Sequence, residues 1–323
     1  MAARLSKKPL AVELRPLAFG EIFDRAVTLY IRNFVPFLAI VAVLIVPLAI
    51  LQYVLDLSSQ PELDAIYKIF THPGAPPPRT IPTMFSSPSV VAVFAVLLLV
   101  TYAIWPFALN AVAIGVARLY RGRPVEFSIC YELALRRWLQ TLGMIGIDLL
   151  VIVGWYVTAV VVIVLAALVV GAFAVLSPVA AVFFGVIFGL IGLIVLLPTL
   201  APLVVALTFS MYCVVIEERP VLDSVALGFA RIFNRAEFWR SILFAVAVAA
   251  VMAGGGAIFG FIGMIAAFAH LPLLQALIES GARAVITPFG VVLMAIYYFD
   301  VRIRREAYDL ESSLERLTAA QPA

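Results

Sequence analysis

The sequence has few charged residues and few of the residue types that form chemical sites. Only 13% of its 323 residues are charged, and it contains two cysteines and two histidines. Soluble domains carry roughly a quarter of charged residues. A water-soluble fold is therefore excluded, and the apolar share of 64%, with a mean hydropathy of +1.12, is typical of a multi-spanning membrane protein.

The scarcity of cysteine and histidine also limits the chemistry. His72 and His270 have no spaced cysteine, histidine or carboxylate partner, so no metal site is expected. Cys130 and Cys213 fall in or beside segments that we place in the cytoplasm, where thiols stay reduced. No phosphate loop, nucleophile elbow or HExxH motif is present. We expect no cofactor and no enzymatic activity, and the net charge of +3 does not indicate nucleic-acid binding.

The apolar runs are long and continuous, without the alternation of polar and apolar residues that marks the strands of a membrane barrel. Runs of about 20 apolar residues cross a hydrocarbon layer of about 30 Å as helices. The first, 35–55, follows 34 mostly polar residues and is too long for a signal peptide, so we expect it to be retained. The sequence predicts an all-α polytopic protein with six transmembrane helices.

The segments between the expected spans differ in length and composition. The proline-rich segment 56–87 is predicted to be a loop. The 78 residues of 139–216 contain one charge and are predicted to form two long helices that break near Ser177-Pro178, although a broken or re-entrant segment is an alternative. After a fifth span, 241–268, a short interfacial segment is expected at 271–283. The expected spans are 35–55, 90–117, two within 139–216, 241–268 and 284–299.

A short motif recurs before the long apolar runs: Arg15-Pro16-Leu17, Arg123-Pro124-Val125 and Arg219-Pro220-Val221. Each motif leads to an aromatic residue at which apolar sequence begins. A recurring motif sets the architecture, so we expect a single membrane domain of three repeat units, each an amphipathic interfacial helix followed by a helical hairpin. The units are approximately 15–117, 123–216 and 219–301, and 302–323 is a cytoplasmic tail.

Residues 19–32 and 222–234 have the apolar spacing of amphipathic helices, with Ser224, Arg231 and Asn234 on the polar face of the second, and 128–137 is a shorter example. Such helices lie in the headgroup plane. They either turn the chain between spans or bind a lipid headgroup or a partner protein. The candidate headgroup-contacting residues are Arg25, Arg32, Arg136, Arg137, Arg231 and Arg235.

The basic residues predict the orientation. Nineteen of the 22 lie in 1–33, 118–137, 219–240 and 302–316, which six spans place on one side. Because lysine and arginine beside spans resist translocation, we expect a bacterial cytoplasmic-membrane protein with both termini in the cytoplasm. Glu279 and Arg283, four positions apart, are predicted to form a helix pair near the outer surface.

Asp148 is the only charge in its long apolar stretch, and Asn110 lies at a matching depth on the preceding span. A carboxylate at this depth costs a few kcal/mol unless it faces other helices. A structural hydrogen bond between Asp148 and Asn110, a proton or substrate relay, and snorkelling toward the headgroups are the alternatives. By contrast, Gly254-Gly255-Gly256 is expected to allow close helix packing.

The two ends of the chain resemble a known family. Leu14-Arg15-Pro16-Leu17 with Gly20-Glu21-Ile22-Phe23-Asp24-Arg25-Ala26, and Tyr297-Tyr298-Phe299-Asp300-Val301-Arg302 with Asp309-Leu310-Glu311, are similar to the glycerophosphoryl diester phosphodiesterase membrane-domain family. The resemblance implies the membrane part alone, because the chain has no region for that family's catalytic barrel. We therefore expect a non-catalytic module that binds membrane lipids, another membrane protein or a second copy, and the alternative is a transporter or flippase that uses Asp148 and Asn110.

Overall fold

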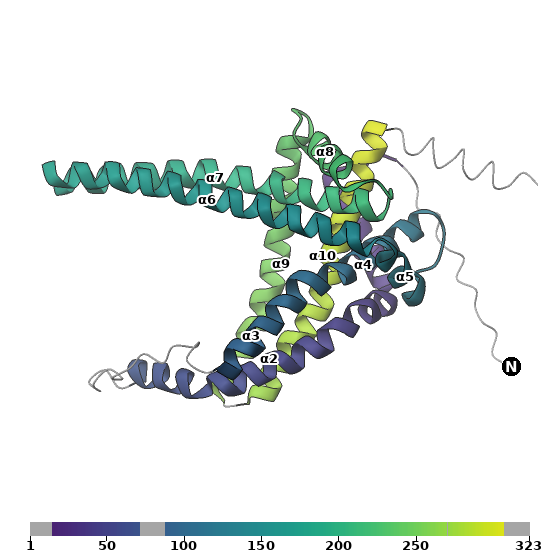
Figure 1. Ribbon diagram of the computed structural model, residues 1–323, viewed down its shortest axis with the longest axis horizontal. Coiled ribbons are helices and arrows are strands. Elements are labelled where there is room, and N and C mark those ends of the chain that lie inside the picture. The colour runs from purple at the N-terminus through teal and green to yellow at the C-terminus, as the bar shows by residue number, and fades with distance from the viewer. Residues whose placement is uncertain (1–14, 72–87, 270, 307–323) are drawn as a thin grey trace, which may run out of the picture. The chain divides into compact units, whose positions relative to one another are not determined.

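The computed structural model describes residues 15–71, 88–269 and 271–306, and all the regular structure in these residues is helical (Figure 1). The helices are α1 (Phe19–Arg32), α2 (Phe34–Thr71), α3 (Pro88–Leu99), the π-helix η1 (Val100–Ile104), α4 (Trp105–Tyr120), α5 (Phe127–Arg136), α6 (Trp138–Leu176), α7 (Pro178–Val215), α8 (Val221–Ile232), α9 (Glu237–Phe268) and α10 (Pro272–Glu306).

Six helical segments of the described chain are long and apolar enough to cross a membrane. The protein is therefore an all-α, multi-pass membrane protein, as its composition predicts. The segments are Phe34–Leu51, Phe94–Tyr120, Trp138–Val175, Pro198–Val215, Glu237–Phe268 and Pro272–Glu306.

Each Arg-Pro motif is followed by a short helix and then by a long one. The short helices α1, α5 and α8 end within a few residues of the starts of α2, α6 and α9. Between α1 and α2, the Asn33 side chain donates to the Leu29 carbonyl at 3.0 Å. The division of the chain into three repeat units stays a prediction, because the compact units of the structure do not follow it.

The first compact unit comprises the described residues of 20–135 and 250–296. Tyr30 ties α1 to α10 in this unit, because its hydroxyl donates to the Val285 carbonyl at 2.7 Å. Its ring stacks on Phe37 and also contacts Phe289. Burial raises the pKa of Tyr30 to about 12, so its hydroxyl remains a donor. Similarly, Tyr131 on α5 donates to the Ile40 carbonyl of α2 at 2.6 Å.

A π-turn interrupts the helix that runs from α3 to α4. In η1 the Trp105 N–H bonds to the Val100 carbonyl, five residues back. Pro106 follows directly and has no N–H to donate, so the regular i→i−4 ladder cannot continue through this turn. Single π-turns of this kind are frequent at functional sites. This one places Thr101 and Trp105 on a cavity described below.

The second compact unit comprises 15–19, 136–249 and the described residues from 297 onward. Here α6 and α7 form a long antiparallel hairpin (Figure 1). Ser177 separates the two helices and caps α7 by accepting from the Ala180 N–H, and Pro178 occupies the first turn. The predicted break at Ser177-Pro178 is confirmed, and both helices are continuous.

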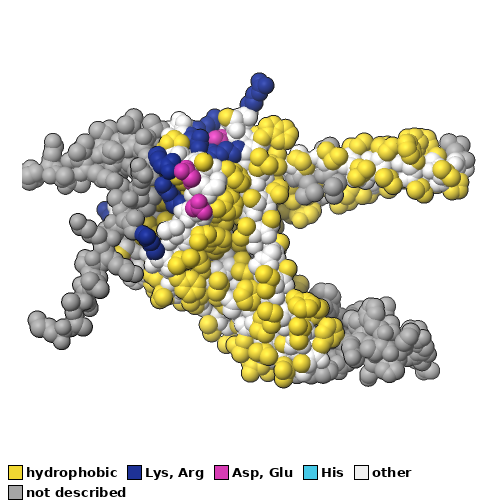
Figure 2. Space-filling model, turned by 180° about the vertical axis from the view of Figure 1, so that it is seen from behind, with side chains coloured by type: hydrophobic (Ala, Val, Ile, Leu, Met, Phe, Trp, Pro, Cys, Tyr) yellow, Lys and Arg dark blue, Asp and Glu magenta, His cyan; other side chains and the backbone are white. Residues whose placement is uncertain are grey.

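The surface of the hairpin is predominantly apolar. Exposed residues such as Val160, Leu168, Phe183 and Ile194 lie on both helices, and Figure 2 shows this surface covered by hydrophobic side chains. Each helix has close to 40 residues and so rises almost 60 Å, at about 1.5 Å per residue. That length exceeds a hydrocarbon layer of about 30 Å, so an upright hairpin extends beyond it.

Two predicted boundaries are wrong. The loop expected at 56–87 begins later, because α2 continues to Thr71. Pro61 alone does not end the helix, since helix-forming residues follow it and the other prolines cluster after residue 72. The rest of this predicted loop lies outside the described residues.

The second wrong boundary is the separate interfacial segment expected at 271–283. It is instead the start of α10, which is continuous from Pro272 to Glu306. Pro272 occupies the first turn of α10, where proline is tolerated. The cost of Gly281, about 1 kcal/mol, is too small to break the helix. The charge of Arg283 faces Glu279 one turn away, with 3.9 Å between Nη2 and Oε2.

Candidate functional site

Asp148 and Asn110, the predicted polar pair, each retain an unpaired polar atom. Asn110 on α4 is only 2% exposed, and its Nδ2 has no hydrogen-bond partner in the described part of the protein. Asp148 on α6 is half-buried, and its Oδ1 is likewise buried without a partner. The two residues belong to different compact units, so their pairing stays a prediction.

The six candidate headgroup-contacting arginines have different environments. Arg32, Arg136 and Arg235 are exposed, and none makes an ion pair within the described residues. Arg25 is half-buried. Arg137 is also half-buried, and it donates to the Arg219 carbonyl and faces Glu218. Arg231 differs from all of them, because it is 2% exposed.

Arg231 is buried because α8 turns its polar face toward the protein. The buried residues of α8 include Ser224, Gly228 and Arg231, whereas Leu222 on the apolar face is 76% exposed. This orientation is the reverse of α1, which buries Ile22 and other apolar residues. In a membrane, lipid solvates apolar side chains and polar groups need protein partners. Arg231 is therefore a core residue, and we do not count it among the headgroup contacts.

Two carboxylates, one on α10 and one just after α7, contact Arg231. Its Nε and Nη2 donate to the two oxygens of Glu306 on α10 at 2.7 and 2.8 Å, in a bidentate fork. Its Nη1 lies 2.7 Å from Oε1 of Glu217, just after α7. Arg302 approaches the same two carboxylates, at 3.4 Å from Glu217 and 3.2 Å from Glu306. We call Glu217, Arg231, Arg302, Glu306 and Tyr298 the ion-pair cluster.

Two further groups complete the surroundings of the ion-pair cluster. The Tyr298 hydroxyl donates to Oε1 of Glu217, and the Tyr298 ring lies 5.2 Å from the Arg231 guanidinium carbon. Cys213 accepts from Nη1 of Arg231 at 3.0 Å. Burial alone would raise the pKa of Glu217, but the hydrogen bond and charge of Arg231 outweigh it and lower this pKa overall. The cluster joins the ends of α7, α8 and α10, and its charges pair with one another.

The lowered pKa of Glu217 predicts an acid-sensitive fold. A carboxylate with a depressed pKa contributes stability above its ordinary pKa, near 4.5, and that stability is lost as the pH falls below this value. We expect the thermal midpoint in detergent to fall less below pH 4.5 in Glu217→Gln than in the wild type. Glu218→Gln, at a half-exposed neighbour, should keep the wild-type response. Equal acid responses in the Glu217 variant and the wild type would contradict this role.

Arginines also anchor the Arg-Pro motifs through backbone carbonyls. The Leu17 carbonyl accepts from Arg240 and Arg304, and the Leu17 N–H donates to the buried Asp300 at 2.6 Å. In the second motif the Pro124 carbonyl accepts from Arg118 at 2.9 Å. The Arg219 carbonyl accepts from Arg137 in the third. Four of the 19 basic residues that the positive-inside rule counts thus hold the chain where it enters the short helices.

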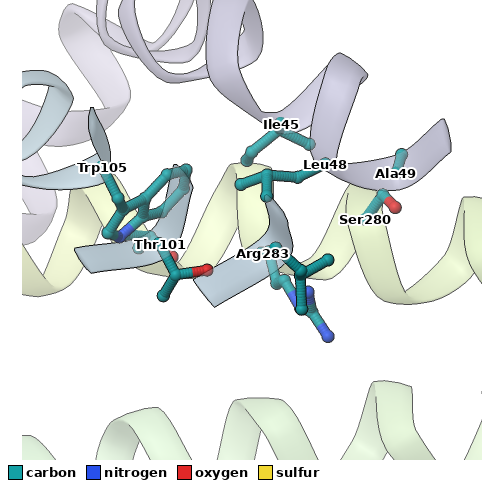
Figure 3. A pocket seen from close by; sticks show the side chains of 9 residues that line it. Ile45, Leu48, Ala49, Thr101, Trp105, Ser280 and Arg283 are labelled. Atoms are coloured by element: carbon teal, nitrogen blue, oxygen red, sulfur yellow. The ribbon is translucent and has the colours of Figure 1, made fainter. Parts of the chain in front are cut away.

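The first compact unit contains a cavity of about 250 Å³. Ile45 and Leu48 of α2 form an apolar wall, and Figure 3 shows Thr101 and Arg283 across from them. On α10, Ser280, Arg283 and Thr287 lie three and four positions apart and so share one face. Trp105 also lines the cavity. Sequence reasoning missed it, because its three walls come from distant segments.

Metal binding has no support in the described residues, which contain no group of three or more histidine, cysteine or acidic side chains that could hold an ion. The ion-pair cluster has no unpaired nucleophile, and the cavity offers one cation and several hydroxyls. The cation and the hydroxyls of the cavity are groups that suit the binding of a ligand.

No family model matches the chain, and no curated protein or solved structure matches it.

Proposed function

We propose that the protein is a non-catalytic module of the cytoplasmic membrane that binds anionic lipid headgroups through its short helices. The observation that carries the proposal is the placement of Arg32, Arg136 and Arg235. Each is exposed, lies at or just after the end of a short helix, and immediately precedes a membrane-length helix. Basic residues in this position interact with anionic lipid at about 1 kcal/mol each.

The resemblance of the two chain ends to the glycerophosphoryl diester phosphodiesterase membrane-domain family agrees with this proposal. The resembling residues include Leu17, Asp300 and Tyr298, which are buried and hydrogen-bonded in the structure. The resemblance concerns a membrane part and carries no catalytic residue with it. Lipids are the proposed partners, and contact with another membrane protein or a second copy is compatible with the same surface.

Lipid retention tests the proposal. The wild-type protein is purified in mild detergent from membranes containing phosphatidylglycerol and phosphatidylethanolamine, and the lipids that remain bound are quantified by mass spectrometry. We expect enrichment of the anionic lipid, and a marked loss of it in the triple variant Arg32→Gln, Arg136→Gln and Arg235→Gln. Asp24→Asn, which also changes one charge on α1, serves as the control. Equal enrichment in the triple variant and the wild type would exclude headgroup binding by these residues.

The proposed orientation has its own test. With the termini and the short helices in the cytoplasm, a single cysteine at Lys7 should react with a membrane-impermeant maleimide only after the cells are broken, whereas one at Pro76 should react in intact cells. Both positions lie outside the described residues, and Cys130 and Cys213 are buried, so background labelling is low. The opposite labelling pattern would invert the topology.

A transporter or flippase is the second candidate, and the unpaired atoms of α6 favour it. The buried Oδ1 of Asp148 and the buried hydroxyl of Thr141, two turns away on the same side of the helix, both lack partners in the described residues. Unpaired polar groups inside a membrane are costly and often mark a substrate or proton path.

Two substitutions of Asp148 separate transport from structure. If Asp148 is a relay, Asp148→Asn should abolish lipid scrambling or solute uptake in proteoliposomes without lowering thermal stability. If Asp148 is structural, Asp148→Asn should leave both nearly intact, whereas Asp148→Leu should destabilise the protein by about 1 kcal/mol, the typical scale of polar contacts between membrane helices. Flux that is the same in the wild type and both variants would remove Asp148 from any transport mechanism.

A further inference from the structure

The cavity of the first unit combines an apolar wall with several hydrogen-bond donors that have no partner among the described residues. The hydroxyls of Thr101, Ser280 and Thr287 and the indole N–H of Trp105 make no hydrogen bond within the described residues. Hydroxyls on helices commonly donate to the carbonyl one turn earlier, as Thr158 and Thr208 do here. The cavity hydroxyls therefore remain available to a ligand.

Arg283 supplies the positive charge of the cavity. Its side chain is 54% exposed, and its one ion-pair partner in the described chain, Glu279, is 3.9 Å away, which is too far for a hydrogen bond. The Glu279 carboxylate instead accepts from Gln275 at 3.0 Å. The planar N–H donors of the guanidinium can thus bind a phosphate through two parallel hydrogen bonds.

The distance along α10 between Arg283 and Arg302 matches the thickness of the hydrocarbon layer. Nineteen residues of this one helix separate it from Arg302, a rise of about 28 Å. This length is close to the hydrocarbon thickness of about 30 Å. With Arg302 and its neighbours at one headgroup layer, Arg283 reaches the other, and Ile45 and Leu48 of the cavity then face the acyl chains.

We propose that this cavity is a binding site for an anionic phospholipid, with Arg283, Thr101 and Ser280 donating to the phosphate and Ile45 and Leu48 packing against the first part of an acyl chain. None of the basic residues of the short helices lines this cavity, and the proposal does not depend on them. The apolar wall distinguishes it from a site for free phosphate. Ala49 lies beside Ser280 in the lining of the cavity, and its small side chain occupies little of the space (Figure 3).

Trp105 provides a local probe of occupancy. In the single-tryptophan variant Trp138→Phe, Trp155→Phe and Trp239→Phe, Trp105 is the only remaining tryptophan. The full-length variant is placed in phosphatidylcholine nanodiscs with a minor share of phosphatidylglycerol, and either lipid carries brominated acyl chains. We expect brominated phosphatidylglycerol to quench Trp105 more strongly than its mole fraction predicts. Arg283→Gln should reduce this preference roughly fivefold or more, whereas Arg121→Gln, at an exposed arginine outside the cavity lining, should leave it unchanged.

Three outcomes would overturn the proposal. Quenching in proportion to mole fraction would show that the cavity does not select an anionic lipid. A preference that survives Arg283→Gln would remove Arg283 from the site. Loss of the preference on adding inorganic phosphate would assign the site to the free ion.

Cavity filling gives a second measurement if the single-tryptophan variant does not fold. Ala49→Phe in the otherwise wild-type chain leaves Arg283 in place but puts a large side chain in the lining of the cavity. It should reduce the phosphatidylglycerol that copurifies with the protein, as Arg283→Gln does. If both variants retain as much as the wild type, the cavity is not a lipid site. Loss of lipid in the Arg32, Arg136 and Arg235 variant alone would support the short helices and not the cavity.

Discussion

Arg231→Met is expected to lower the free energy of unfolding of the detergent-solubilised protein by about 3 kcal/mol. Removing one partner of a buried ion pair costs about 3–5 kcal/mol, because the other charge stays buried without compensation. The lower end applies here, since Arg219 and Arg302 still face Glu217 after the substitution, at 2.9 and 3.4 Å. Denaturant or thermal titration monitored by size-exclusion chromatography measures the change.

A matched control and a double variant test whether loss of the buried ion pair causes this destabilisation. Arg235→Met removes an exposed guanidinium four positions away and should cost less than about 0.5 kcal/mol. Adding Glu217→Gln to Arg231→Met should recover part of the stability, because the neutral amide is cheaper to bury than the charge. Equal effects of the Arg231 and Arg235 substitutions would show that the ion-pair cluster does not stabilise the fold. No recovery in the double variant would show that Arg219 and Arg302 already compensate the charge of Glu217.

The sequence predicts the spans well because their signal is local. Apolar runs that begin at Phe34 and Trp138 become α2 and α6, which start at those residues. The Ser177-Pro178 break is also a local signal, a cap followed by a residue without an N–H. By contrast, α2 and α10 are longer than expected, because the helices continue through Pro61 and Gly281, whose helix-breaking effect depends on the residues around them.

The ion-pair cluster and the cavity were beyond such reasoning because their residues are far apart in the chain. Arg231 meets Glu306, 75 positions away, and the cavity joins α2, the π-turn and α10. Periodicity alone also misjudged α8, because an amphipathic pattern shows that a helix has two faces but does not say which face meets protein. In water the apolar face is buried, whereas in a membrane lipid can cover it and the polar face is buried.

The sites of close helix packing could likewise not be predicted from the local sequence. The sequence directs attention to Gly254-Gly255-Gly256, where only Gly255 approaches another helix, with a substituted Cβ 3.1 Å from Ile286. The closest approach is instead at Gly228 on α8. There a Cβ would overlap the Ser210 hydroxyl and lie 2.7 Å from both the Ala206 carbonyl and the Ser210 nitrogen of α7. Nothing in the local sequence distinguishes Gly228 from other helical glycines.

Gly228→Ala is therefore expected to destabilise the protein by about 3 kcal/mol, the upper part of the range for overpacking. The neighbouring atoms include α7 backbone, which cannot rotate away, so α8 must shift as a whole. This shift would pull Arg231, less than one turn further along α8, away from Glu217 and Glu306. The intrinsic gain of about 1 kcal/mol from alanine in a helix is too small to offset these losses.

Alanine substitutions at two other glycines of the chain serve as controls for Gly228→Ala. Gly146→Ala on α6 meets nothing within 4 Å and should be neutral or slightly stabilising. Gly290→Ala meets only the flexible end of Met252, at 2.9 Å, so a small rotation of that side chain should relieve it at little cost. If Gly228→Ala is no more destabilising than Gly290→Ala, then α8 is not held against α7 at the distance described, and the geometry of the ion-pair cluster that depends on this contact would have to be revised.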